Sequence, residues 1–139
     1  MSHADIAIQF NESFKRCVND PYFIDNFYEI FFSSSDEVKV IFKNTDIETQ
    51  KVMLITSMAY MTDAYSDKHD LLSDIADRHN ITNLNIKPHL YPLWLDCLVA
   101  TAKSIDPLFD GNTEQLWRAV LQPGIDYMIS KYNQSSLIE

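Results

Sequence analysis

The stretch Leu71-Leu72-Ser73-Asp74-Ile75-Ala76-Asp77-Arg78-His79 carries more information than any other part of this chain. Steps of four residues place Leu71, Ile75 and His79 on one face of a helix, so the imidazole projects from an apolar stripe. A histidine in such a stripe is most often a hydrogen-bonded core residue, and the alternative is a metal ligand. The choice between these two interpretations depends on the residues before and after the stretch.

The composition is that of an ordinary globular protein. With 139 residues the chain is long enough to bury a substantial core, and we expect one domain over residues 1–139. Apolar residues make up 46% of the sequence and charged residues 22%. Only two glycines and five prolines are present, which leaves little room for the tight turns of a β-rich fold. The composition therefore favours an all-α fold.

Charge and cysteine usage exclude several classes of function. The formal net charge is −9 and no basic patch is clustered, which argues against a nucleic-acid or anionic-membrane partner. Cys17 and Cys97 lie in no CxxC or CxxCH motif, so there is no zinc signature and no motif for covalent cofactor attachment. The N-terminus resembles no signal peptide, and no window approaches about 18 uninterrupted apolar residues. We therefore expect a cytoplasmic protein.

Apolar residues recur at helical spacing along most of the chain. The pattern predicts seven helices, over residues 4–19, 21–33, 36–42, 46–65, 67–79, 88–106 and 113–132. Asp20 is the expected N-cap of the second helix, with Pro21 at its first position. Pro123 should kink the last helix without ending it, because apolar spacing resumes at Ile125. In the helix over 46–65 the expected buried residues are Val52, Ile55, Met58, Ala59 and Met61.

Five short motifs occur in order along the chain, with His79 among them. They are Phe27-Tyr28, Val40-Ile41-Phe42, Thr49-Gln50-Lys51-Val52-Met53-Leu54, His79 itself, and Asn85-Ile86-Lys87-Pro88 with Tyr91 after it. This ordered set resembles a haem-binding globin, and it is closest to single-domain bacterial haemoglobins and the globin domain of flavohaemoglobins. The resemblance covers about residues 14–132. It implies a globin fold of about seven helices around a pocket for non-covalently bound haem b.

The resemblance places Tyr28 and Gln50 on the distal side of the haem, facing a bound gas. The step of fourteen residues from Tyr28 to Phe42 matches the family's step from that tyrosine to the phenylalanine that packs on the haem. Leu54, one turn after Gln50, resembles the apolar residue over the iron. Bound oxygen carries partial negative charge, so a hydroxyl or an amide stabilises it by donating a hydrogen bond. The alternatives are a core aromatic for Tyr28 and a solvated helix residue for Gln50.

On the proximal side the resemblance implies that His79 binds the iron. The other ring nitrogen must then donate a hydrogen bond, either to the carbonyl of Ile75 or to Tyr91, which is otherwise a core tyrosine. Arg78 and Lys87 could pair with the haem propionates, although exposed cations are common. The candidates for the apolar wall of the pocket, some of which we expect to be ordinary core, are Phe42, Met53, Leu54, Met58, Leu72, Ile75, Ile86, Trp94 and Leu95.

The chain also departs from the flavohaemoglobin pattern. No glutamate occupies the place in the last helix where that family pairs one with the proximal histidine, and Asp126 lies about two turns too early. The only glycines are Gly111 and Gly124, so no Gly-rich loop for a flavin or nicotinamide phosphate is present. We therefore expect no catalytic turnover without a separate reductase.

Three functions stay open at the level of sequence. The leading one is reversible binding of oxygen or another diatomic gas, by a monomer or a homodimer. The second is conversion of nitric oxide to nitrate, with electrons from a separate reductase. The third is a haem-free sensor or interaction domain with a globin fold, in which His79 is a core residue.

Overall fold

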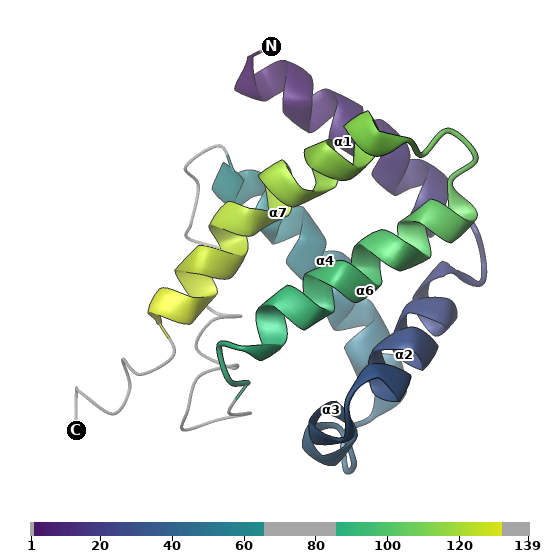
Figure 1. The fold of residues 1–139 in the computed structure, drawn as a ribbon, viewed down its shortest axis with the longest axis vertical. Coiled ribbons are helices and arrows are strands. Elements are labelled where there is room, and N and C mark those ends of the chain that lie inside the picture. Colours follow the sequence, from purple (N-terminus) through teal and green to yellow (C-terminus); the bar gives the residue numbers. More distant parts are fainter. Residues whose placement is uncertain (1, 66–85, 132–139) are drawn as a thin grey trace.

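The structure is a computed structural model, and it describes residues 2–65 and 86–131. Figure 1 shows that these residues form helices and no strand, which confirms the predicted all-α fold. The helices are α1 His3–Val18, α2 Phe23–Ser34, α3 Asp36–Ile41, α4 Ile47–Tyr65, α6 Leu90–Ile105 and α7 Gly111–Ser130. Each corresponds to one predicted helix, and the remaining prediction, over 67–79, lies outside the described residues. None of the described helices is long and apolar enough to cross a membrane.

Side-chain caps set the starts of three of the six described helices. Ser2, Ser35 and Asp110 each accept a hydrogen bond from a backbone N–H in the first turn of α1, α3 and α7. The prediction for α2 was wrong, because Asp20 accepts from the N–H of Tyr22 in a turn and the helix begins only at Phe23. Helix α7 runs through Pro123 to Ser130, as the resumed apolar spacing indicated.

The helices pack in crossed pairs around one apolar core. Helix α4 packs mainly on α7, α2 on α6, and α1 on α7. In Figure 1, α6 and α7 lie side by side, and α4 passes behind them from α2 towards α7. Trp117 is fully buried, and the rings of Phe10, Phe14 and Phe23 meet it edge to face. This aromatic cluster joins α1 and α2 to α7.

Burial along α4 differs between its two halves. Met58 and Met61 are buried as predicted, and Ile55 is half-buried. The predictions for Val52 and Ala59 were wrong, because Ala59 is exposed and Val52 has 67% of its surface exposed. The reason is that α4 packs chiefly on α7, and these two side chains do not lie on the face that makes this contact.

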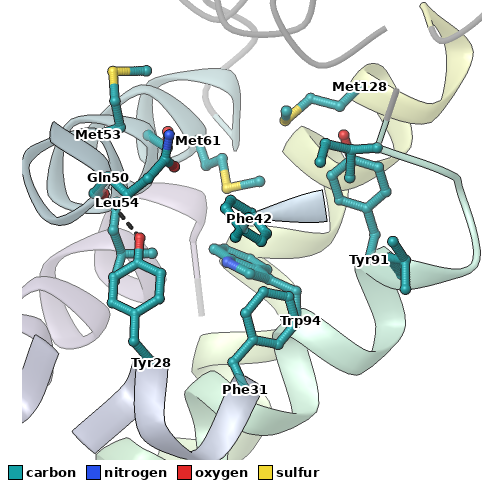
Figure 2. Close-up of a pocket in the computed structure, with 13 residues that line it drawn as sticks. Tyr28, Phe31, Phe42, Gln50, Met53, Leu54, Met61, Tyr91, Trp94 and Met128 are labelled. Atoms are coloured by element: carbon teal, nitrogen blue, oxygen red, sulfur yellow. Dashed lines mark hydrogen bonds between the residues drawn. The ribbon is translucent and has the colours of Figure 1, made fainter. Parts of the chain in front are cut away.

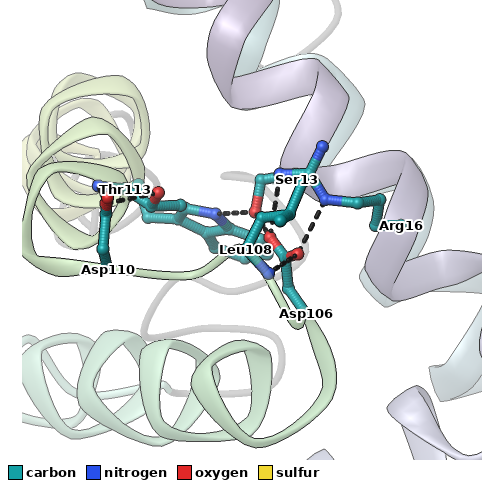
Figure 3. A network of polar contacts seen from close by, with 7 residues as sticks. Ser13, Arg16, Asp106, Leu108, Asp110 and Thr113 are labelled. Atoms are coloured by element: carbon teal, nitrogen blue, oxygen red, sulfur yellow. Dashed lines mark hydrogen bonds and ion pairs between the residues drawn. The ribbon is translucent and has the colours of Figure 1, made fainter.

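A buried carboxylate ties the N-terminal helix to the connection between α6 and α7 (Figure 3). The side chain of Asp106 is fully buried and accepts from Ser13 Oγ at 2.6 Å, from Arg16 Nε at 2.7 Å and from the N–H of Leu108 at 3.0 Å. Ser13 Oγ in turn accepts from Nε1 of Trp117 at 2.9 Å. Burial alone would raise the pKa of Asp106, but the bonds from Arg16 and Ser13 hold it below its ordinary value.

We expect Asp106→Asn to destabilise the protein by about 2–4 kcal/mol, because it removes the charge that Arg16 and Ser13 stabilise inside the fold. Urea unfolding followed by circular dichroism measures this loss. The matched control is Asp96→Asn, which removes an exposed carboxylate paired with Arg118 and should change stability by less than about 0.5 kcal/mol.

The pH dependence gives a second readout of the same interaction. Because the folded pKa of Asp106 is lowered, its contribution to stability is complete above its unfolded pKa of about 3.9 and is lost as the pH falls towards the folded value. The stability difference between wild type and Asp106→Asn should therefore shrink below about pH 4. A difference that stays constant from pH 7 to pH 3 would contradict the proposed role of the charge.

Candidate functional site

A cavity that is partly open to solvent lies among α2, α4, α6, α7 and the end of α3 (Figure 2). None of the described residues that line the cavity carries a charged side chain. They are Tyr28, Phe31, Phe42, Gln50, Met53, Leu54, Ser57, Met61, Ile86, Leu90, Tyr91, Trp94 and Met128.

The cavity brings together residues that are far apart in the sequence and that were singled out as candidates. Six of the nine candidate site residues line it, namely Tyr28, Phe42, Gln50, Leu54, Ile86 and Tyr91. The other three, Ile75, Arg78 and His79, lie outside the described residues. Met53 and Trp94 also line the cavity, whereas Met58 and Leu95 are buried in the core and do not reach it.

The hydroxyl of Tyr28 is already engaged by the protein. It donates to the backbone carbonyl of Gln50 at 2.8 Å, as the dashed line in Figure 2 shows. Burial raises the pKa of Tyr28, so the hydroxyl keeps its proton throughout the physiological range. A hydroxyl has one proton to donate and two lone pairs that accept. In this arrangement Tyr28 therefore offers the cavity an acceptor, and it can donate there only by releasing the carbonyl.

The side-chain amide of Gln50 is the second polar group at this end of the cavity. It is half-buried, and it makes no hydrogen bond to another residue in the part of the chain that the structure describes. Figure 2 shows the amide between Met53 and Met61. An amide can both donate and accept, so Gln50 supplies a donor that no protein contact in the described region occupies.

Some lining residues were missed at the level of sequence, although part of the signal was present. Gln50, Leu54, Ser57 and Met61 follow one another at steps of four, three and four, so they form one stripe along α4. Extending the stripe from Leu54 would have found Ser57 as well as Met61. Phe31 follows Tyr28 by three residues on α2 and could have been found in the same way. Leu90 and Met128 had no comparable signal, because their place depends on how α6 and α7 pack.

Lys87 lies near the cavity but already has a partner. Its ammonium group is 3.8 Å from Glu37 of α3, and Nε2 of His89 is 2.7 Å from the same carboxylate. These exposed contacts connect α3, which leads to Phe42, with the segment that leads into α6. A propionate partner at Lys87 would therefore compete with Glu37.

The cavity is bounded where α4 crosses α7, and this crossing needs a glycine. A Cβ added at Gly124 would lie 2.6 Å from Cγ and 3.0 Å from Cβ of Met61, closer than real Cβ contacts allow. Met61 lines the cavity, and so does Met128, one turn after Gly124. Gly124 therefore sets how closely the two helices approach beside the cavity.

We expect Gly124→Ala to destabilise the protein by about 1–3 kcal/mol, because relief of the clash with Met61 requires α4 to move. Alanine otherwise favours a helix over glycine by about 1 kcal/mol. Gly111→Ala is the control, since a Cβ there meets nothing within 4 Å. Thermal unfolding compares the two variants. Equal stability of both would show that Met61 can shift without destabilising the protein.

The described residues form a helical protein with an uncharged, largely apolar cavity between its helices, which is an arrangement typical of small-molecule sites. A globin family model matches residues 25–128. The structure is also similar to the crystal structure of protein PA3967 from Pseudomonas aeruginosa PAO1, described as structurally highly homologous to a human haemoglobin. The TM-score is 0.87, the sequence identity is 31%, and the match covers 91% of this chain and 98% of that chain. No curated protein matches the chain. The chain belongs to the globin family, which confirms the predicted resemblance.

Proposed function

We propose that this globin binds haem b non-covalently in the cavity among α2, α4, α6 and α7, and that it binds oxygen or another diatomic gas reversibly in the cytoplasm. The observation that carries the proposal is the convergence of Tyr28, Phe42, Gln50, Leu54, Ile86 and Tyr91 on one cavity. These residues come from four separate parts of the chain. An ordinary core would not require the polar groups of Tyr28 and Gln50 at one end of it.

The chemistry of the cavity fits haem, which is a large and mainly apolar disc with two carboxylates at one edge. Phe31, Phe42, Leu54 and Ile86 offer apolar walls, and none of the described lining residues carries a charge that would be desolvated by the disc. The opening to solvent suits a ligand that is only partly enclosed and that carries charged groups at one edge. When bound, haem supplies the iron at which a diatomic gas coordinates.

Different residues of the chain would contact the proximal and the distal side of the haem. We assign the iron ligand to His79, with Ile75 and Arg78 beside it, on the grounds of the sequence motif. Phe42 and Leu54 would pack on the haem, and Tyr28 and Gln50 would set the polarity on the distal side. Tyr91 would lie near the proximal histidine, where its hydroxyl can orient the imidazole.

Titration with haem tests the cofactor directly. The purified chain should take up one equivalent and give a ferrous–carbon monoxide absorption spectrum, and His79→Ala should lose stable haem retention or regain it only with added imidazole. His89→Ala is the matched control, because His89 is exposed and contacts Glu37, and its spectrum should equal that of the wild type.

Two results would assign a different function. If the folded wild-type chain takes up no haem, the remaining candidate function is a haem-free sensor or interaction domain. Sustained consumption of nitric oxide once a separate reductant is supplied, with nitrate as product, would make the protein a nitric oxide dioxygenase that depends on a reductase partner.

The distal hydrogen bonds give a second prediction. Because Tyr28 donates to the carbonyl of Gln50, we expect the amide of Gln50 to be the main donor to oxygen. A hydrogen bond to a charged acceptor contributes about 1.5–3 kcal/mol, so Gln50→Leu should weaken oxygen affinity about tenfold or more, with a smaller effect on carbon monoxide.

Tyr28→Phe should change oxygen affinity less than Gln50→Leu does. Stopped-flow and flash-photolysis rates for both gases in the two variants give this comparison. If the tyrosine variant has the larger effect, the hydroxyl must leave the carbonyl of Gln50 and turn to the gas.

A further inference from the structure

The two halves of α4 are held in the fold very differently. In the second half Met58, Met61 and Tyr65 are buried, and Met61 contacts Gly124 of α7. In residues 47–54 only Leu54 is buried, and the outer face is open to solvent at Ile47 and Val52. The inner face of residues 47–54 lies on the cavity, through Gln50, Met53 and Leu54. The first half of α4 is therefore a thin wall between the cavity and solvent.

Two polar contacts connect this wall to α2. The hydroxyl of Tyr28 donates to the carbonyl of Gln50 at 2.8 Å, and Nζ of Lys51 lies 2.7 Å from Oδ1 of Asp25. Apart from these contacts, α2 and α4 hardly approach each other along their backbones. Both contacts involve neighbouring residues of α4, so together they fix one turn of the wall against α2.

The pair between Lys51 and Asp25 lies outside the cavity, and neither residue lines it. Lys51 also contacts Glu48 within α4, at 3.2 Å. The bond to Asp25, followed by the bond to Glu48, raises the pKa of Lys51, which keeps the side chain charged. Asp46 accepts from the N–H of Glu48 and from the hydroxyl of Thr49. The start of α4 is thus intact as a helix, even though Leu54 is the only buried residue of residues 47–54.

We propose that residues 47–54 form a movable cover of the cavity, and that Tyr28 and the Asp25–Lys51 pair are positioning residues that hold this cover closed. The cover moves relative to the second half of α4, which α7 anchors at Met61. The restraints that α2 places on this segment are a partly exposed ion pair and one neutral hydrogen bond, which are weak, so we expect the open form to be a minor but accessible state. Under the function proposed above, opening admits the gas to the cavity.

Amide hydrogen exchange of residues 50–54 tests the cover without any assumption about haem, because the haem-free chain can be measured as well. Asp25→Asn changes only α2, and it should speed exchange in residues 50–54 of α4 by about two- to fivefold, as expected for a partly exposed ion pair. Tyr28→Phe should speed it by about three- to tenfold. Amides of α6 and α7 should keep their wild-type rates.

Two control variants each change one carboxylate side chain of α2, the helix that carries Asp25. Glu29→Gln removes an exposed carboxylate of α2, one turn after Asp25, that has no partner among the described residues, and it should leave exchange unchanged. Asp25→Glu keeps the carboxylate and should restore the wild-type rates. Unchanged exchange in Asp25→Asn, or an equal increase in Glu29→Gln, would overturn the proposal.

Gas kinetics separate a cover from an ordinary structural contact. If the Asp25–Lys51 pair holds a cover closed, Asp25→Asn should raise the association and dissociation rates of carbon monoxide by the same factor and leave its affinity unchanged. A change in the dissociation rate alone would assign the pair to retention of the gas and contradict the cover. If the chain binds no haem, the exchange measurement still decides the proposal, so its failure is distinguishable from that of the gas-binding function.

Discussion

The close contact between Met61 and Gly124 fixes where α4 crosses α7, and the cavity depends on that crossing. Helix α4 contributes a stripe of four lining residues, from Gln50 to Met61, so any change in its position moves the whole stripe. A side chain larger than hydrogen at position 124 would clash with Met61 and displace the stripe to which Met61 belongs. Two helices can approach this closely only where one of them lacks a Cβ. Gly124 therefore helps to set the position of the lining residues of α4, although Gly124 itself does not line the cavity.

Much of the fold could be predicted from local signals in the sequence. The starts of α1, α3 and α7 follow from capping side chains, and the run of α7 through Pro123 follows from the apolar residues after it. The prediction failed at Asp20, where a turn of the same residue types precedes the helix. It also failed at Val52, since the apolar pattern cannot tell which face of α4 a distant helix will cover. Such errors are expected where tertiary packing decides burial.

The candidate site also separates what local sequence signals can predict from what tertiary packing decides. The family motif named Tyr28, Phe42, Gln50, Leu54, Ile86 and Tyr91, and the fold gathers all six on one cavity. The motif did not reveal that the hydroxyl of Tyr28 donates its proton to the backbone carbonyl of Gln50. A motif records which residue types occur, whereas the direction of a hydrogen bond depends on where two helices meet. Local spacing also could not predict Met128, which lines the cavity only because α7 crosses α4 nearby.

The hydrogen bond from Tyr28 links the polarity of the cavity to the position of its wall. While the hydroxyl holds the carbonyl of Gln50, it presents only lone pairs to the cavity, and the first half of α4 stays against α2. When that half of α4 moves away, the hydroxyl loses its acceptor and its proton becomes free to be donated elsewhere. Access to the cavity and the number of donors inside it are therefore coupled through one proton. A weakly packed segment beside a binding site is common, because motion there costs little of the stability of the core. Here the well-packed contact at Met61 confines the motion to the half of α4 that lies between the cavity and solvent.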